Sequence, residues 1–279
     1  MDFVKMHGLG NDFVIVETDS WNEADHLQKY AQFICDRHFG IGADGLVAVG
    51  PDEEMDIFMR IFNSDGSEPE MCGNGIRCVA RYAYEKGWVK NNNISVRTLA
   101  GARYPQIETA AGKSVTVRVD MGQPVLERSL IPMQGEGSTV KVSLPTEQRI
   151  FEVTAVSMGN PHCINFVEDI DQVPVAAWGS IIEIDPMFPA KTNVEFVQIL
   201  ARDEMIMRVW ERGAGITMAC GTGACATLVA AVLNDLTDRK ATIHLLGGDL
   251  HIEWNEENNH VYMTGPAEYV FNGKIEMKE

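Results

Sequence analysis

The stretch Cys72-Gly73-Asn74-Gly75 recurs at an offset of 148 positions as Cys220-Gly221-Thr222-Gly223, and this repetition decides the fold. The register also holds before the quartets, because Met59-Arg60-Ile61-Phe62 falls on Met207-Arg208-Val209-Trp210 at the same offset. A helix-forming segment of similar length follows each quartet. The order strand, turn, Cys-Gly-x-Gly, helix is therefore predicted twice.

Two further landmarks extend the repetition. Gly10-Asn11 matches Gly159-Asn160 at an offset of 149, and Asp120-Met121-Gly122 resembles Met263-Thr264-Gly265. Four landmarks in one order, with a period far longer than that of a solenoid, indicate two duplicated domains.

The local patterns predict a strand-rich α+β fold. Helical spacing occurs chiefly in residues 23–37, 75–85 and 223–234. Short β-type runs are more frequent, at residues 13–16, 55–62, 115–119, 151–156, 194–200, 205–210 and 241–246. The break Gly122-Gln123-Pro124 suggests domains of residues 1–118 and 119–265, with the tail 266–279 returning to the first.

Composition limits the partners. Forty acidic against 23 basic residues give a net charge of −17, without the basic footprint that nucleic acid binding needs. We find no signal sequence and no apolar run of about 18 residues, so we expect a cytoplasmic protein that does not bind membranes. Six cysteines in a chain of this length predict reduced thiols rather than a disulfide scaffold.

Duplicated domains related by a pseudo-twofold axis would bring equivalent elements face to face across a cleft, which is a preferred ligand site. Cys72 and Cys220 would then face each other. At a helix start, partial positive charge favours a thiolate, so we expect a lowered thiol pKa. The same backbone N–H groups can hold a carboxylate, which the glycines allow to approach closely.

Two thiols suit a specific reaction. Inverting a carbon acid requires a proton to leave one face of Cα and another to arrive on the opposite face. Cysteine serves as either thiol or thiolate near neutral pH without a metal. The other four cysteines, Cys35, Cys78, Cys163 and Cys225, are interpreted as packing residues.

The second half carries polarity that the first lacks. His162 aligns with Phe13, and Glu211-Arg212 aligns with Asn63-Ser64. Taken alone, each reads as a structural histidine or an exposed ion pair, but together we expect them to encode asymmetry in the substrate. The remaining histidines show no metal-ligand spacing, and no Gly-x-x-x-x-Gly-Lys loop occurs.

Over essentially its full length the chain resembles diaminopimelate epimerases, of the pyridoxal-independent two-thiol racemase group. The resemblance rests on the motifs 7–13 (HGLGNDF), 71–78 (MCGNGIRC), 159–162 (GNPH), 192–196 (TNVEF) and 211–223 (ERGAGITMACGTG). It implies domains in which a sheet wraps around a central helix, no cofactor or metal, and interconversion of LL- and meso-diaminopimelate in lysine and cell-wall precursor synthesis. It also suggests a homodimer.

The resemblance further implies roles for individual residues. Cys72 and Cys220 would be the acid/base pair, assisted by His162 and Glu211. The reacting amino-carboxylate end would be held by Asn11 and by the backbone of Gly73-Asn74 and Gly221-Thr222. The distal carboxylate would be held by Asn63, Asn160, Asn193 and Arg212, and the distal ammonium by Glu211.

Two positions depart from the family pattern. Gly45 stands where a glutamine is frequent, and Ile216 where a polar residue is common. Two alternatives remain open: a proline or hydroxyproline racemase, whose substrate would leave Glu211 and Arg212 without partners, and a non-catalytic redox or binding protein with a Cys72–Cys220 disulfide.

Overall fold

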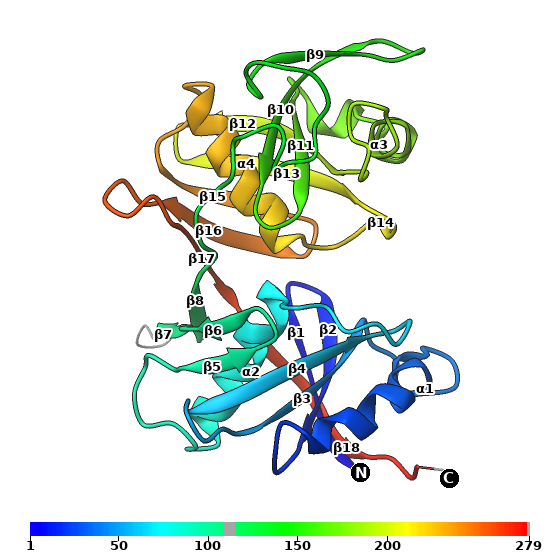
Figure 1. The fold of residues 1–279 in the computed structure, drawn as a ribbon, viewed down its shortest axis with the longest axis vertical. Coiled ribbons are helices and arrows are strands. Elements are labelled where there is room, and N and C mark those ends of the chain that lie inside the picture. The colour runs from blue at the N-terminus through cyan, green and yellow to red at the C-terminus, as the bar shows by residue number, and fades with distance from the viewer. Residues whose placement is uncertain (109–114, 278–279) are drawn as a thin grey trace. The chain divides into compact units, whose positions relative to one another are not determined.

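The computed structural model describes residues 1–108 and 115–277, which form two compact units. Unit 1 comprises residues 1–120 and 264–279, and unit 2 comprises residues 121–263. Both mix a large sheet with few helices (Figure 1). The predicted α+β class is therefore confirmed.

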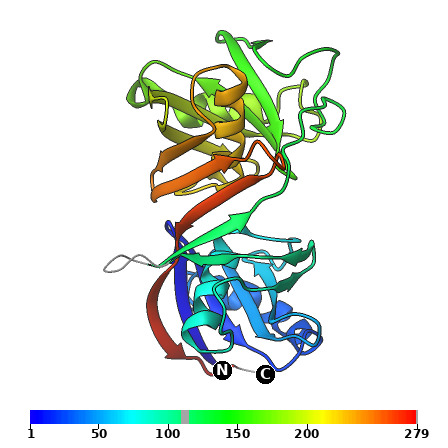
Figure 2. The same cartoon turned by 90° about the vertical axis from the view of Figure 1, so that its left-hand side faces the viewer.

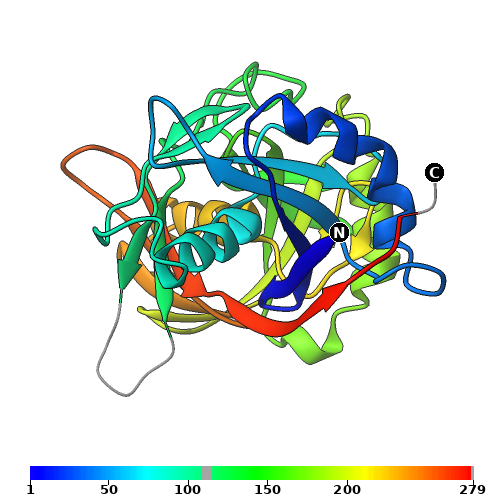
Figure 3. The ribbon, with the colours of Figure 1, turned by 90° about the horizontal axis from the view of Figure 1, so that it is seen from below.

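Unit 1 contains a seven-stranded sheet in the order β18-β1-β2-β3-β4-β5-β6. C-terminal strand β18 pairs antiparallel with N-terminal strand β1, and Figure 3 shows the two side by side. The elements are β1 (Asp2–Gly8), β2 (Asn11–Glu17), η1 (Glu23–Tyr30), α1 (Ala31–Cys35), β3 (Gly45–Pro51), β4 (Ile57–Asn63), α2 (Gly73–Glu85), β5 (Val96–Thr98), β6 (Gly101–Arg103), β7 (Gln106–Glu108), β8 (Thr116–Asp120) and β18 (Glu268–Lys274).

Unit 2 contains strands in the order β17-β16-β15-β13-β12-β11-β10-β9, and the colours of these strands run from green to orange-red in Figure 2. Its elements are β9 (Val142–Pro145), β10 (Ile150–Ser157), β11 (Pro161–Phe166), η2 (Ile170–Gln172), α3 (Val175–Glu183), β12 (Asn193–Ala201), β13 (Glu204–Glu211), β14 (Gly215–Ile216), α4 (Gly221–Leu233), β15 (Lys240–Leu245), β16 (Gly248–Trp254) and β17 (Val261–Pro266). Helix α3 has no counterpart among the helices predicted from the sequence.

The duplication is visible in strand connectivity. In unit 1, β1–β2 is antiparallel, β2–β3 parallel, β3–β4 antiparallel, β4–β5 parallel and β5–β6 antiparallel. In unit 2 the series β10, β11, β12, β13, β15 and β16 repeats this alternation in the same order. One topology has therefore been used twice.

Helices α2 and α4 occupy the same place in the two topologies, and each has 13 residues. Helix α2 packs against β1, β2, β4, β7 and β8, and α4 packs against β10, β11, β12, β15 and β16. Apolar residues cover nearly all sides of α4, as expected of a helix enclosed by protein. None of the described helices is long and apolar enough to cross a lipid bilayer.

Candidate active site

Each half-site is organised by a cysteine at a helix N-cap. Cys72 precedes α2 in an extended conformation, and its sulfur accepts the backbone N–H of Gly75 at 3.4 Å. Cys220 precedes α4 in the same way and accepts the N–H of Gly223 at 3.4 Å. In each case the thiol takes the place of the usual hydroxyl or carboxylate cap and lies where helix-terminal N–H groups concentrate.

The matched glycines before the asparagines also have a structural reason. Gly10 and Gly159 both adopt positive φ, at 85° and 94°, which L side chains rarely adopt. These turns bring Asn11 to the first position of β2 and Asn160 to the position just before β11. The same local geometry therefore presents an amide in each unit.

In unit 1, Asn11 links the thiol to a carboxylate. Its Oδ1 lies 4.0 Å from the sulfur of Cys72 and accepts from Asn74 Nδ2 at 3.0 Å. Its Nδ2 donates to Asp44 at 2.7 Å. Because a carboxylate only accepts, Asp44 fixes the amide of Asn11 with its oxygen towards Cys72.

A network of ion pairs surrounds the carboxylates of Asp12 and Asp44. Arg37 bridges Asp12 and Asp44 at 2.8 and 2.7 Å, and buried Lys5 lies 2.6 Å from Asp12. Burial opposes ionisation of Asp12, but the hydrogen bonds and charges of Arg37 and Lys5 outweigh it and lower the pKa of Asp12. The carboxylate of Asp12 is thus kept anionic.

In unit 2, Cys220 is buried among acidic groups. Burial, followed by the negative charges of Glu211 and Glu195, raises the pKa of Cys220 well above its ordinary value. The expected lowering of the thiol pKa at the helix start is therefore wrong for Cys220, because the N–H of Gly223 and the hydroxyl of Thr222 are outweighed. Cys220 is a thiol in this state.

Glu211 accepts a hydrogen bond from this thiol. Burial raises the pKa of Glu211, against the lowering effect of a hydrogen bond from Thr217 and the neighbouring His162. The hydrogen bond from the Cys220 thiol also lowers the pKa of Glu211. Glu211 is therefore positioned to receive the proton of Cys220.

His162 is completely buried between two acceptors. Its Nδ1 lies 2.7 Å from Glu195 Oε1, and its Nε2 lies 3.0 Å from Asn160 Oδ1. Atoms of His162, Glu195 and Cys220 lie within 4.8 Å of one another, a set of ligand types that zinc accepts. With acceptors facing both ring nitrogens, however, His162 serves hydrogen bonding here rather than a metal.

The predicted distal-end residues fall in different places. Asn193, at the start of β12, accepts the backbone N–H of Arg212 at 2.9 Å and donates to Pro161 O at 2.9 Å. The Arg212 guanidinium is exposed and donates to Ala190 O at 3.1 Å. Asn63, in unit 1, donates to Ser67 at 3.0 Å.

The predicted residues therefore divide between the units. Asn11, Cys72, Gly73 and Asn74 come together in unit 1, where Asn63 ends β4. In unit 2, Asn160, His162, Cys220, Gly221, Thr222 and Glu211 come together, and Asn193 connects them to Arg212.

The structure also shows the surroundings of the two positions that depart from the family pattern, Gly45 and Ile216. Gly45 begins β3 and is buried, and an added Cβ would lie 3.3 Å from Phe62 O, so a side chain fits there only if its neighbours shift. Ile216 is half exposed on β14.

Sequence reasoning missed three carboxylates. Asp44 orients Asn11, Glu195 pairs with His162, and Glu183 accepts the N–H of Gly213 at 3.1 Å and the indole N–H of Trp210 at 2.7 Å. For Glu195 there was a signal: it is an acidic residue among the apolar side chains of Val194, Phe196 and Val197 on β12. A buried carboxylate needs a partner, so this position predicts a polar contact, and the strand register decides that the partner is His162.

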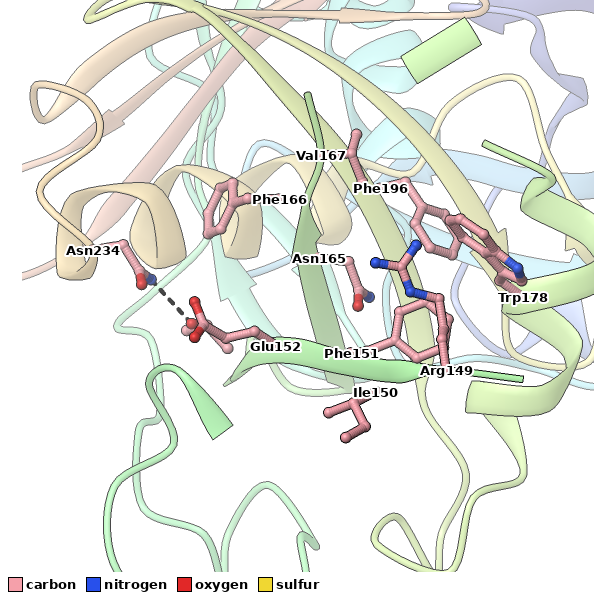
Figure 4. A pocket seen from close by; sticks show the side chains of 11 residues that line it. Arg149, Ile150, Phe151, Glu152, Asn165, Phe166, Val167, Trp178, Phe196 and Asn234 are labelled. Atoms are coloured by element: carbon pink, nitrogen blue, oxygen red, sulfur yellow. Dashed lines mark hydrogen bonds between the residues drawn. The ribbon is translucent and has the colours of Figure 1, made fainter. Parts of the chain in front are cut away.

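A separate hollow of about 220 Å³ lies in unit 2 and is lined mainly by residues of β10, β11, β12 and α3 (Figure 4). Arg149 stacks on Trp178 beside it, and Asn234 donates to Thr154 at 3.0 Å. It contains none of the predicted site residues.

The family model for diaminopimelate epimerase matches residues 3–127 and 154–270. The chain belongs to the diaminopimelate epimerase family. The Heliobacterium modesticaldum protein named diaminopimelate epimerase is 59% identical over 279 residues, covering 99% of both chains. The family resemblance inferred from the motifs is therefore confirmed, and it places the chain among isomerases.

Solved structures extend the likeness to the fold. The Bacillus anthracis phenazine biosynthesis protein of the PhzF family has a TM-score of 0.73 at 16% identity, covering 99% of each chain. A probable proline racemase from Agrobacterium radiobacter K84 has a TM-score of 0.71 at 16% identity, covering 99% of this chain and 93% of the other. At such identities the epimerase-family fold is shared, but the substrate does not follow from it.

Proposed function

We propose that this protein interconverts LL- and meso-diaminopimelate by two-base proton transfer, with Cys72 and Cys220 on opposite faces of the reacting Cα. Membership of the family supports the substrate, and one structural observation supports the chemistry: each unit presents a thiol at the N-cap of an equivalent 13-residue helix.

The two-thiol reaction conserves protons in both directions. A thiolate at Cys72 takes the Cα proton, the electron pair of the broken C–H bond is delocalised into the substrate carboxylate, and the thiol of Cys220 donates a proton to the opposite face. Cys220, protonated in the described state, begins as the acid in this direction. The enzyme ends with the two protonation states exchanged, and the reverse reaction restores them.

The same groups account for binding. Helix-start N–H groups of Gly73-Asn74 and Gly221-Thr222, with Asn11, would hold the reacting carboxylate as negative charge develops on it. Arg212 and the amides of Asn63, Asn160 and Asn193 would hold the distal carboxylate. Glu211 would pair with the distal ammonium, since a carboxylate suits an ammonium.

The proposal also covers the cellular location, the pathway and the oligomeric state of the enzyme. We infer a cytoplasmic enzyme of lysine and cell-wall precursor synthesis, acting without a cofactor and as a homodimer. The net charge of −17 disfavours nucleic acid as a partner. Sedimentation analysis of the full chain tests the dimer.

The deciding experiment follows Cα proton exchange in deuterated water. Deuterium should enter LL- and meso-diaminopimelate but not L-proline, which lacks the distal amino-carboxylate. Cys72→Ala and Cys220→Ala should each abolish epimerisation while circular dichroism stays unchanged. Persisting epimerisation in either variant would refute the two-thiol assignment, and exchange into proline would favour the racemase alternative.

A further inference from the structure

A continuous series of hydrogen bonds runs from a buried carboxylate to the thiol of Cys220. Glu195 contacts His162 at 2.7 Å, and His162 contacts Asn160 at 3.0 Å. Asn160 Nδ2 lies 3.3 Å from Thr222 Oγ1, which lies 3.6 Å from the sulfur of Cys220. We call these five side chains the Glu195 chain.

The strand register explains its first contact. His162 on β11 is the parallel neighbour of Asn193 on β12, and Glu195 follows two positions later. Alternate residues of a strand point to the same face, so the register directs the imidazole and the carboxylate to one side of the sheet. Both are fully buried.

The carboxylate of Glu195 determines which atoms donate and which accept along the Glu195 chain. Glu195 only accepts, so Nδ1 of His162 carries a proton, and Asn160 Oδ1 facing Nε2 requires a second one. Among the described residues, Glu195 Oε2 is buried without a hydrogen-bond partner, which leaves His162 as the group that compensates its charge. Two acceptors facing the two ring nitrogens match the two N–H groups of an imidazolium.

The orientation of the Asn160 amide then decides where the hydroxyl proton of Thr222 points. With Oδ1 of Asn160 occupied by the imidazolium, its amide N–H donates to the hydroxyl of Thr222. The single hydroxyl proton of Thr222 is left to point at the sulfur of Cys220. If His162 were neutral at Nε2, Asn160 would turn its N–H towards the ring and accept from Thr222, and the sulfur would lose this donor.

We propose that Glu195 is a positioning residue of the Cys220 half-site: by holding His162 as a buried imidazolium it sets the direction of the Glu195 chain, so that Thr222 donates to the Cys220 thiolate whenever that thiolate forms. This rests on the proposed two-thiol function. In this arrangement the sulfur of Cys220 has two donors, the hydroxyl of Thr222 and the backbone N–H of Gly223.

Other groups around the sulfur act in known directions. Glu211 on β13 and Glu195 on β12 both raise the pKa of Cys220, while Thr222 and the N–H of Gly223 lower it. His162 on β11 lies within 4.8 Å. If Glu195 acted only through its own charge, it would disfavour the Cys220 thiolate. If it acts through the Glu195 chain, it favours that thiolate. Whether removal of the Glu195 charge slows or speeds the reaction of Cys220 therefore distinguishes the two modes of action.

The test uses the full chain carrying Cys72→Ala, so that alkylation by iodoacetamide reports on Cys220 after mapping by mass spectrometry. Glu195→Gln keeps the shape of the side chain and removes its charge. Near neutral pH we expect the alkylation rate to fall about tenfold, and nitrogen NMR of His162 to change from two protonated ring nitrogens to one. Glu152→Gln, an exposed carboxylate of unit 2, should change neither.

A second variant shows whether the effect travels along the chain. Thr222→Val removes the hydroxyl and should also slow alkylation of Cys220. In the variant that carries both Thr222→Val and Glu195→Gln, the fold-decrease in alkylation rate should be smaller than the product of the two single fold-decreases, because both substitutions act on one donor. Glu195→Asp, which keeps the charge, should restore two protonated nitrogens.

Faster alkylation in Glu195→Gln, an unchanged His162 spectrum, or independent effects of the two substitutions would overturn the proposal. These readouts need no substrate. A wild-type chain that fails to epimerise diaminopimelate but gives the expected spectra and rates would refute the proposed function and leave this inference standing.

Discussion

The sulfur of Cys220 accepts the backbone N–H of Gly223 at 3.4 Å, and an added Cβ at Gly223 would lie 3.1 Å from that sulfur and 2.7 Å from Glu195 Oε1. In unit 1 the corresponding Cβ at Gly75 would lie 3.7 Å from the sulfur of Cys72, with the flexible end of Met59 at 3.0 Å as its nearest neighbour. The two half-sites therefore differ in how tightly they enclose the helix start.

Gly223→Ala should consequently disrupt more than Gly75→Ala. In Gly223→Ala the new methyl meets a fixed carboxylate and the reacting sulfur, and overpacking of this kind costs about 1–3 kcal/mol. In Gly75→Ala the end of Met59 can move, and alanine favours the helix by up to about 1 kcal/mol. Urea unfolding and epimerisation rates should rank the variants in this order, and equal losses would contradict the difference in enclosure.

Asp44→Asn should weaken catalysis without unfolding the protein. The substitution releases the amide of Asn11 from its fixed orientation, and a hydrogen bond to a charged group contributes about 1.5–3 kcal/mol. We expect kcat/KM to fall roughly tenfold to a hundredfold. Asp56→Asn, whose carboxylate binds Ser95 on the surface of unit 1, is the matched control and should leave kcat/KM unchanged. An Asp44→Asn enzyme with wild-type kcat/KM would show that Asn11 needs no such anchor.

Glu211→Gln should make Cys220 easier to ionise. The charge of Glu211 is a cause of the raised pKa of Cys220, second only to burial, so its removal lowers that pKa. In a Cys72→Ala background, where alkylation reports on Cys220, the pH midpoint of Cys220 alkylation should move down. A midpoint that stays or rises would show that Glu211 does not oppose the thiolate.

Alkaline pH should destabilise the fold through its buried thiols. Burial raises the pKa of Cys78 to about 12, whereas an unfolded thiol titrates near about 8.5. Below the unfolded value both states hold the proton. As pH rises between the two values only the folded state keeps it, so the free energy of unfolding falls by about 1.4 kcal/mol per pH unit for this thiol.

Cys78→Ala tests this relation. The variant begins less stable because it loses packing in α2, but its free energy of unfolding should decline less steeply above pH 9 than that of the wild type. Urea unfolding at a series of pH values gives both slopes. Parallel slopes would mean that Cys78 is not what the folded state protects from ionisation.

The sequence by itself determined the duplication, the α+β class and the position of both thiols. Each Cys-Gly-x-Gly quartet contains the residues that end one strand connection and begin a helix, so local chemistry is sufficient to place Cys72 and Cys220 at helix starts. The positive-φ glycines before Asn11 and Asn160 are equally local. Such features depend on neighbours a few residues away, and for that reason they could be predicted.

Only the tertiary structure decided how the thiols are tuned. Glu195 lies 33 positions from His162 in sequence, and the parallel register of β11 and β12 brings them together. The raised pKa of Cys220 arises from burial and from carboxylates on two other strands, which reversed the expectation from the helix start alone. Desolvation and charge act through space, so their balance exists only once the strands are aligned.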